Sequence, residues 1–378
     1  MNNIDRKLEA QVIRAAIDQK HKYDLASGLA GVLLMETYFY HRWPTEMRRK
    51  NIESMVALLI EALADEEMPV SLWNGLVGVA YALEFLTASC PDIVCPHVSE
   101  FIDDVDDLLL GYLENHGETR QYDLISGITG IGAYALTRTN RSAAKNLFVA
   151  VERELYRSLT DTGSGRTWFK RGLNRQTAAL AAEPVIDLGI AHGAPGVVLL
   201  LCAGVRDKLI TVGELPDLVN TLRRCQLPSP SYSKYGYFYP ESKTEASRVA
   251  WCYGDLSIAF CFASAAEVLE DGELEAFSHD MISRRMAQTE ASYEIYDNGL
   301  CHGYAGLHHL LVKLSKRDPR LLSNVRTVHQ RLIRDRDLNS TYHCQPGLLD
   351  GMAGVLLAMN DGASRGQYHW DTCYSLGF

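Results

Sequence analysis

Seven apolar segments recur along the chain, and glycine introduces each of them. Every segment places an apolar residue, two variable residues and a glycine ahead of an apolar run, usually with a second glycine three residues after the first. Two examples are LASGLAGVLLM from Leu25 and IAHGAPGVVLLL from Ile190. The leading glycines, spaced 47, 52, 66, 61, 49 and 48 residues apart, are Gly28, Gly75, Gly127, Gly193, Gly254, Gly303 and Gly351. A pattern that returns at so even a period predicts a repeat architecture.

Each repeat is predicted to contain two helices. The run after each glycine, such as GVVLLLCAGV, is apolar on nearly all sides and indicates a buried helix. The stretches between the runs are amphipathic, for example KNIESMVALLIEALAD from Lys50, and they indicate helices with one face in solvent. Seven such pairs predict an all-α fold with seven inner and seven outer helices.

The repeats are expected to close into an α/α toroid, which is a double-walled barrel. An open solenoid needs polar caps at its ends, yet the first and seventh runs are as apolar as the middle ones. We therefore expect residues 1–378 to form a single toroid domain of seven repeats, with irregular insertions at about 160–185 and 227–245. The second insertion is rich in Pro, Ser and Tyr, which fits either a plain surface loop or a lid over a substrate site.

Composition and charge exclude several classes of protein. Of the 378 residues, 47% are hydrophobic and 22% charged, which is typical of a globular protein. The formal net charge of −10 comes without a basic stripe and argues against a nucleic-acid partner. The N-terminal residues do not form an export signal, and no apolar run reaches about 18 residues, the length needed to span a membrane. These features predict a cytoplasmic protein whose nine cysteines stay reduced.

The residues just before the leading glycines are expected to meet at one rim of the barrel, because every repeat turns at the same end. All seven are polar or amphipathic: Ser27, Asn74, Ser126, His192, Tyr253, His302 and Asp350. One position earlier, cysteine occurs in the fifth and sixth repeats alone, as Cys252 and Cys301. The register of the repeats therefore predicts that two thiols and the neighbouring imidazole of His302 converge.

Cys252, Cys301 and His302 form a set of side chains suited to zinc. Thiolate and neutral imidazole are preferred zinc ligands, and three protein ligands leave the fourth tetrahedral position open for chemistry. A fourth protein ligand, for which Cys261 and Cys344 are the candidates, would instead make the site structural. The plainer alternative is that both cysteines are small buried hydrophobic residues.

Three further residues are candidates for chemistry beside this site. His192 lies on the same rim and can act as an acid or a base. Arg248, four residues before Cys252, can stabilise an anion or an enolate, or it can form an ordinary surface ion pair. Asp123 in YDLISG has a near copy, Asp24 in YDLASG, and the register alone does not choose between them.

Four motifs resemble those of a known family. WCYG, CHGYAG, AHGAPG and GLLDGMAG are similar to motifs of the lanthionine synthetase C-like cyclases, and in particular of the stand-alone cyclases of class I lanthipeptide (lantibiotic) biosynthesis. The resemblance covers all seven repeats and implies an α/α toroid with one catalytic zinc ion at one end. By this resemblance the zinc ligands are Cys252, Cys301 and His302, and the other active-site positions are His192, Arg248 and Asp123. The resemblance thus favours Asp123 over Asp24.

The chain departs from the family pattern at two points. Where the family often continues WCYG as Gly-x-Pro-Gly, this chain has Gly254, Asp255, Leu256 and Ser257, so the second glycine is missing. The chain also shows no inserted peptide-binding domain of the kind that some members carry between early repeats. We therefore leave open how the leader of a precursor peptide would be held.

The resemblance implies a zinc-dependent peptide cyclase. Such an enzyme forms (methyl)lanthionine thioether rings by Michael-type addition of peptide cysteine thiols to dehydroalanine or dehydrobutyrine. Its expected partners are a dehydrated precursor peptide and, in a biosynthetic complex, a dehydratase and an ABC-type exporter through which it would associate peripherally with the membrane. The alternative is a zinc-containing helical protein of the same family that binds peptides or glutathione without ring closure. A glycosidase or terpenoid cyclase would need a rim carboxylate pair, for which Asp350 and Asp123 give little support.

Overall fold

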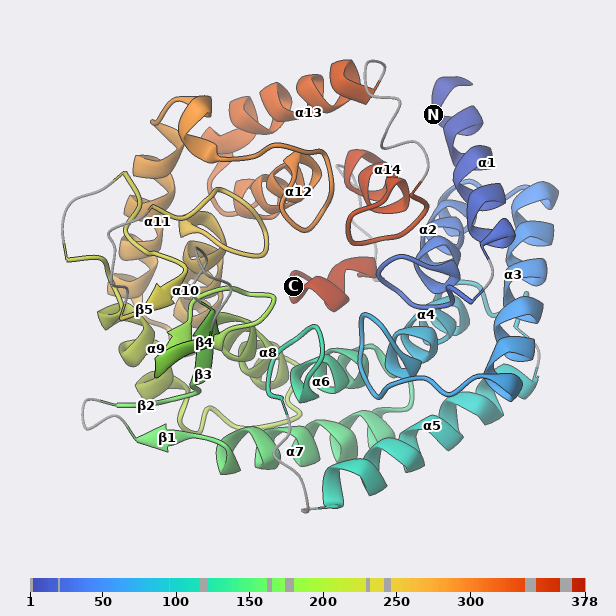
Figure 1. The fold of residues 1–378 in the computed structure, drawn as a ribbon, viewed down its shortest axis with the longest axis horizontal. Helices are drawn as coiled ribbons and strands as arrows, with labels where there is room; N and C mark the ends of the chain where they lie inside the picture. The colour runs from blue at the N-terminus through green and yellow to red at the C-terminus, as the bar shows by residue number, and fades with distance from the viewer. Residues whose placement is uncertain are drawn as a thin grey trace.

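The protein forms two concentric rings of helices (Figure 1). The computed structural model describes residues 3–19, 21–94, 96–115, 121–161, 165–173, 180–228, 232–240, 246–336, 345–360 and 369–377. The inner helices are α2 (Leu29–Arg42), α4 (Leu76–Ser89), α6 (Ile128–Thr137), α8 (Ala194–Arg206), α10 (Asp255–Leu269), α12 (Tyr304–Ser315) and α14 (Met352–Asn360). The outer helices are α1 (Asn3–Asp18), α3 (Glu46–Asp65), α5 (Pro96–Glu114), α7 (Arg141–Arg157), α9 (Leu215–Arg224), α11 (Gly272–Met286) and α13 (Leu322–Arg336).

Each inner helix packs against the next, and α14 packs against α2, so the inner ring closes. The predicted α/α toroid of seven inner and seven outer helices is thereby confirmed for the described residues. The two sequence patterns explain the two walls. Inner helix α4 buries side chains around its whole circumference, whereas outer helix α5 buries one stripe at a spacing of three or four residues, namely Val98, Ile102, Val105, Leu109 and Leu113.

The loops before the inner helices are joined by a closed ring of backbone hydrogen bonds. Each bond has an N···O distance of 2.9–3.4 Å and connects one repeat with the next. The donor and acceptor pairs are Ala26 to Trp73, Trp73 to Ile125, Leu124 to Ala191, Ile190 to Cys252, Cys252 to Cys301, Cys301 to Leu349 and Leu349 to Ala26. All seven loops therefore lie at the same end of the barrel, as the register of the repeats predicts.

The fifth repeat turns differently from the others. Gly254, the N-cap of α10, has a φ of 128°, whereas the glycine N-caps of α2, α4, α6, α8 and α12 have extended backbone with negative φ. The same repeat lacks the second glycine. Ser257 stands in its place, and its hydroxyl donates to the carbonyls of Ala250 and Gly254 at 3.2 and 2.9 Å. The departure from the family motif therefore preserves the rim.

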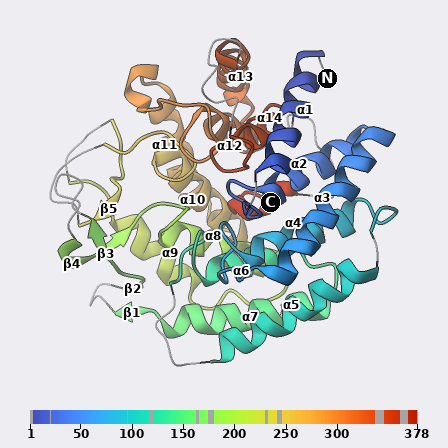
Figure 2. The same ribbon diagram turned by 45° about the vertical axis from the view of Figure 1, so that its right-hand side comes forward.

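The two segments expected to be irregular contain short strands (Figure 2). They are β1 (Thr160–Asp161), β2 (Arg166–Thr167), β3 (Lys170–Leu173), β4 (Leu180–Asp187) and β5 (Phe238–Tyr239). Strands β1 and β2 form an antiparallel pair, and β3, β4 and β5 form a three-stranded antiparallel sheet beside α8, α9 and α10. Strands β1, β2 and β5 have only two residues each, which is too short to leave an alternating pattern in the sequence. The backbone amides of Lys234 and Tyr235 donate to the carboxylate of Asp255 and tie the second segment to the start of α10.

The C-terminal residues fill the centre of the ring (Figure 1). The 3₁₀ helix η4 (Trp370–Tyr374) lies among the inner helices, and Tyr374 packs edge-on against Trp73 and Trp251 with ring centroids 4.7 and 4.8 Å away. Elsewhere in the described residues, 3₁₀ helices form at η1 (Glu290–Tyr293) and η2 (Pro319–Leu321). Within the described residues, no helix combines the length and apolar character required to cross a membrane.

Candidate functional site

The rim loops of the fifth and sixth repeats bring the two predicted cysteines together. Cys252 donates its backbone N–H to the Cys301 carbonyl at 3.1 Å, and the Cys301 thiol is hydrogen bonded to the sulfur of Cys252. The hydrogen bond from Cys301 is the main cause of a lowered pKa at Cys252. The positive charge of Arg248 and the ring of His302 lower it further, whereas burial opposes the shift. The same hydrogen bond and burial raise the pKa of Cys301 well above its ordinary value. The two neighbouring thiols therefore have opposite pKa shifts, lowered at Cys252 and raised at Cys301.

His302 lies between two carboxylates. Its Nδ1 is 3.2 Å from Asp350 Oδ1, and its Nε2 is 3.3 Å from Asp297 Oδ2. Asp350 is the main cause of a raised pKa at His302, and Asp297 adds to it, although burial opposes both. One potential ligand atom from each of Cys301, His302 and Asp350 lies within 4.8 Å of the others. Carboxylates beside a ligating imidazole are typical of metal sites, because they orient the ring.

This set of side chains fits zinc. Two neighbouring cysteine sulfurs, together with an imidazole, are the soft and borderline donors that zinc prefers. The described ligand atoms that lie within 4.8 Å of one another come from Cys301, His302 and Asp350, so Asp350 joins two of the three predicted ligands. The third, Cys252, is not part of that group and lies beside Cys301 through their backbone hydrogen bond. Cys261 belongs to a different environment, because it is fully buried in α10 and its thiol donates to the Pro195 carbonyl at 3.6 Å. Cys344 lies outside the described residues.

The structure also pairs His192 with Asp123 on the same rim. Asp123 Oδ2 is 3.7 Å from His192 Nδ1, and Asp123 Oδ1 accepts the backbone N–H of Ser126 at 2.8 Å. The imidazole side chain is 41% exposed, so it is open to a substrate. Asp24 makes the equivalent bond to the backbone N–H of Ser27 at 2.7 Å in the first repeat. Of the two near copies, Asp123 is thus the one in reach of His192.

Arg248 is half-buried and faces the cysteines instead of forming a surface ion pair. Its backbone N–H and its Nε donate to the hydroxyl of Tyr237 at 3.2 and 3.4 Å, and its guanidinium lies 5.9 Å from the centre of the same ring. The positive charge helps to lower the pKa of Cys252. Arg248 can therefore stabilise negative charge beside the proposed metal ligands.

Three residues at the rim, Asp187, Asp297 and Lys170, were not identified as candidates from the sequence. The buried carboxylate of Asp187 accepts a hydrogen bond from the Tyr253 hydroxyl at 2.8 Å and forms an ion pair with Lys170. The sequence does contain a pattern that could have identified Asp187, because Asp187 and Asp297 occupy the same repeat position, six residues before a leading glycine. Each of them accepts the backbone N–H two residues later, at 2.8 and 2.7 Å. No comparable signal marks Lys170, which lies in an insertion.

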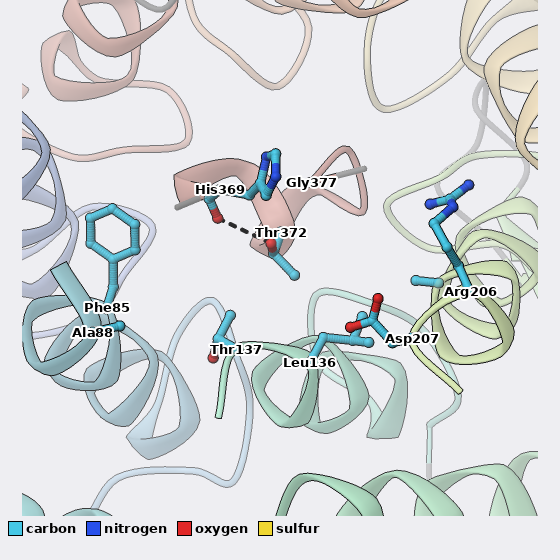
Figure 3. A pocket seen from close by; sticks show the side chains of 10 residues that line it. Phe85, Ala88, Leu136, Thr137, Arg206, Asp207, His369, Thr372 and Gly377 are labelled. Atoms are coloured by element: carbon cyan, nitrogen blue, oxygen red, sulfur yellow. Dashed lines mark hydrogen bonds between the residues drawn. The ribbon is translucent and has the colours of Figure 1, made fainter. Parts of the chain in front are cut away.

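A cavity of about 370 Å³ lies at the opposite end of the inner ring (Figure 3). Its walls come from the last turns of α4, α6 and α8 and from C-terminal residues, among them Thr137, Arg206, His369 and Thr372. The inner helices begin at the rim that carries the cysteines, so this cavity is separated from them by the length of the barrel. The chemistry described above belongs to the rim and not to this cavity.

Comparison with known proteins identifies the family. The family model described as lanthionine synthetase C-like protein matches residues 19–374. The chain belongs to the lanthionine synthetase C-like family. Among solved structures, nisin cyclase shares the fold, with a TM-score of 0.81 and 16% sequence identity over 100% of this chain and 98% of that one. No curated protein sequence gives a significant match. Membership of the lanthionine synthetase C-like family confirms the relationship expected from the four motifs.

Proposed function

We propose that this member of the lanthionine synthetase C-like family is a zinc-dependent lanthipeptide cyclase. Membership of the family and the fold shared with nisin cyclase support a cyclase. The observation that carries the proposal is the thiol pair of Cys252 and Cys301 beside His302, on the rim that also presents His192 and Asp123. The substrate is a dehydrated precursor peptide that contains cysteine together with dehydroalanine or dehydrobutyrine.

Zinc would be held by Cys252, Cys301 and one ring nitrogen of His302, and the carboxylate at the other nitrogen, Asp297 or Asp350, would orient the imidazole. When bound, it would lower the pKa of a substrate thiol at its open position, and two protein thiolates would keep that sulfur electron-rich. The substrate thiolate adds to the β-carbon of the dehydroamino acid, so a carbon–sulfur bond forms and the alkene becomes an enolate.

The other rim residues complete the reaction. His192 donates a proton to the α-carbon of the enolate, and Asp123 holds the imidazole in the orientation that donation requires. Arg248 stabilises the negative charge of the enolate. The step balances because the proton lost by the thiol is matched by the proton that His192 adds at the α-carbon, and His192 regains its proton from solvent. No oxidant or reductant is needed.

The test uses a synthetic peptide with one cysteine and one dehydroalanine. Ring closure leaves the mass unchanged, so the reaction is followed by alkylating the remaining free thiols and counting the added groups by mass spectrometry. The zinc-loaded protein should reduce the alkylated fraction with time, whereas Cys301→Ala should leave it constant. An unchanged count with the zinc-loaded wild type would overturn the proposal for this peptide.

The alternative is a zinc-containing protein of the same family that binds peptides or glutathione without ring closure. Its site would be closed by a fourth protein ligand, and the carboxylate of Asp350 is the described group nearest to that role. X-ray absorption spectroscopy of the zinc-loaded protein, with and without a thiol ligand, separates the two. A cyclase gains a third sulfur ligand, whereas a closed site keeps its coordination shell.

The setting of the reaction follows from the proposed substrate. An upstream dehydratase must supply the dehydroamino acids, and an ABC-type exporter would take up the cyclised product. We expect the chain to work in the cytoplasm, in a complex with these partners and at the membrane through them.

A further inference from the structure

The inserted strands end at a buried carboxylate on the catalytic rim. Asp187, the last residue of β4, is fully buried, and three groups surround its side chain. The backbone N–H of Gly189 donates to Oδ1 at 2.8 Å, the Tyr253 hydroxyl donates to Oδ2 at 2.8 Å, and the ammonium of Lys170 forms an ion pair with Oδ2. A carboxylate buried in this way requires a cationic partner, because desolvation of an unpaired charge is costly.

Lys170 contacts two rim loops at once. It lies on β3, opposite Val185 of β4, and its side chain is about one-third exposed. Besides the ion pair with Asp187, its Nζ donates to the backbone carbonyl of His192 at 3.3 Å. Through Asp187 the same lysine reaches Tyr253, the residue after Cys252. The pair of Lys170 and Asp187 therefore connects the loop of His192 with the loop of Cys252.

We propose that Lys170 and Asp187 form a positioning clamp that sets the distance between His192 and the proposed zinc site. This inference rests on the proposed cyclase function, in which His192 donates a proton to a carbon atom of the bound peptide. Proton transfer requires the donor to lie within hydrogen-bond distance and in the correct orientation. A small displacement of the loop that carries His192 is therefore expected to lower the rate of the transfer strongly. Lys170 comes from the insertion between α7 and α8 and Asp187 lies just after it, which makes that insertion part of the catalytic apparatus.

The first test removes the clamp and restores it. Lys170→Met takes away the ammonium, and Lys170→Arg keeps the charge and the donors. We expect Lys170→Met to lower kcat for the dehydroalanine peptide by about 10- to 100-fold, with KM and bound zinc unchanged, which is the range for partners that orient reactive groups. Lys170→Arg should retain most of the wild-type kcat. Loss of zinc along with kcat in Lys170→Met would overturn the positioning role.

Lys170→Met leaves Asp187 buried without a cation and could lower activity simply by destabilising the fold. A double variant separates this effect from loss of the clamp. Lys170→Met with Asp187→Asn removes both charges; the amide oxygen still accepts from Gly189, and the amide NH2 can donate to the Tyr253 hydroxyl oxygen. It should fold and still show the reduced kcat. The matched control is Lys234→Met, which removes another partly buried lysine ion pair, with Asp280 at 3.0 Å, from the segment before α10. The control should keep the wild-type kcat.

A second readout does not depend on activity. Hydrogen exchange of the zinc-loaded protein, followed by mass spectrometry, reports how firmly residues 188–193 are held. Exchange there should accelerate in Lys170→Met and in the double variant and match the wild type in Lys170→Arg and Lys234→Met. If the wild type fails to close the peptide ring, the proposed function fails and exchange alone still decides on the clamp. Wild-type kcat or wild-type exchange in the double variant would overturn the clamp.

Discussion

At the scale of single residues, the site depends on neighbours that change what each side chain can do. Cys252 and Cys301 differ in their pKa shifts because one sulfur accepts the hydrogen bond that the other donates. Cys261 has the same chemistry but lies among apolar side chains, where burial raises its pKa well above the ordinary value. Burial without a charged partner makes a thiol inert, so the environment separates ligands from core cysteines.

The first prediction compares these cysteines by substitution. Cys301→Ala should abolish stoichiometric zinc binding and lower cyclisation by more than about 100-fold, because one of three metal ligands is lost. Cys261→Ala is the matched control and should keep zinc, at a stability cost of about 1 kcal/mol for the small cavity. Zinc per chain is measured by elemental analysis after dialysis. Full zinc occupancy in Cys301→Ala would remove this cysteine from the site.

The second prediction concerns the buried histidine of α12. Burial, with the nearby rings of His329 and His309, lowers the pKa of His308 to about 3. The unfolded chain takes up a proton near pH 6.5, so the stabilising contribution is complete above that pH and decreases as the pH falls from 6.5 toward 3. Between pH 7.5 and 5 this residue should remove about 2 kcal/mol from the free energy of unfolding.

The measurement is urea unfolding of the wild type and of His308→Leu at both pH values. The variant cannot take up the proton, so its loss of stability between the two pH values should be smaller by about the same 2 kcal/mol. Equal losses in both proteins would show that His308 is not held neutral by burial.

At the scale of elements, the repeating segments allowed the helices and the rim to be predicted from the sequence, whereas the non-repeating segments did not allow their structure to be predicted. Period and apolar runs predicted each inner helix, and the register placed Cys252, Cys301 and His302 on one rim. The strands around Lys170 lie in an insertion that has no counterpart in the other repeats, so the register could not align them with the rim. The central position of η4 also depends on contacts distant in sequence, such as the bond from Trp251 to the Tyr374 carbonyl at 2.9 Å.

The third prediction uses the turn before α10. At a φ of 128° a side chain is strained, and a Cβ on Gly254 would overlap the Arg248 carbonyl oxygen. Gly254→Ala should therefore lower stability by about 1–3 kcal/mol and weaken zinc binding, because the turn lies two residues from Cys252. Thermal unfolding and a chelator competition measure the two effects.

Gly111→Ala gives the matched control for this substitution. Gly111 lies inside α5, and a Cβ there would meet nothing within 4 Å. Alanine is the better helix former, so this variant should gain about 0.5–1 kcal/mol of stability and leave zinc binding as it is. If both variants were destabilised alike, the positive φ at Gly254 would not be the cause.

At the scale of the whole molecule, the closed ring needs its centre filled, and the C-terminal residues do this through charge as well as packing. Asp371 of η4 is fully buried and contacts His309 Nε2 at 2.7 Å and Lys313 Nζ at 2.5 Å, both from α12. Burial alone would raise the pKa of Asp371, but Lys313 and His309 hold it well below its usual range. This ion pair fixes the helix whose Tyr374 carbonyl bonds to Trp251, one residue before Cys252.

The last prediction follows from that chain of contacts. Asp371→Asn leaves Lys313 buried without a counter-charge, so the free energy of unfolding should fall by about 3–5 kcal/mol, and η4 should loosen from the inner ring. Because η4 supports Trp251, zinc should dissociate at a lower temperature than in the wild type. Asp280→Asn breaks more exposed ion pairs instead, with Lys234 and Arg284, and should cost less than about 1 kcal/mol. Thermal unfolding with simultaneous detection of released zinc compares the variants. If Asp371→Asn unfolded early but kept zinc until the global transition, the centre of the ring would contribute to stability without supporting the site.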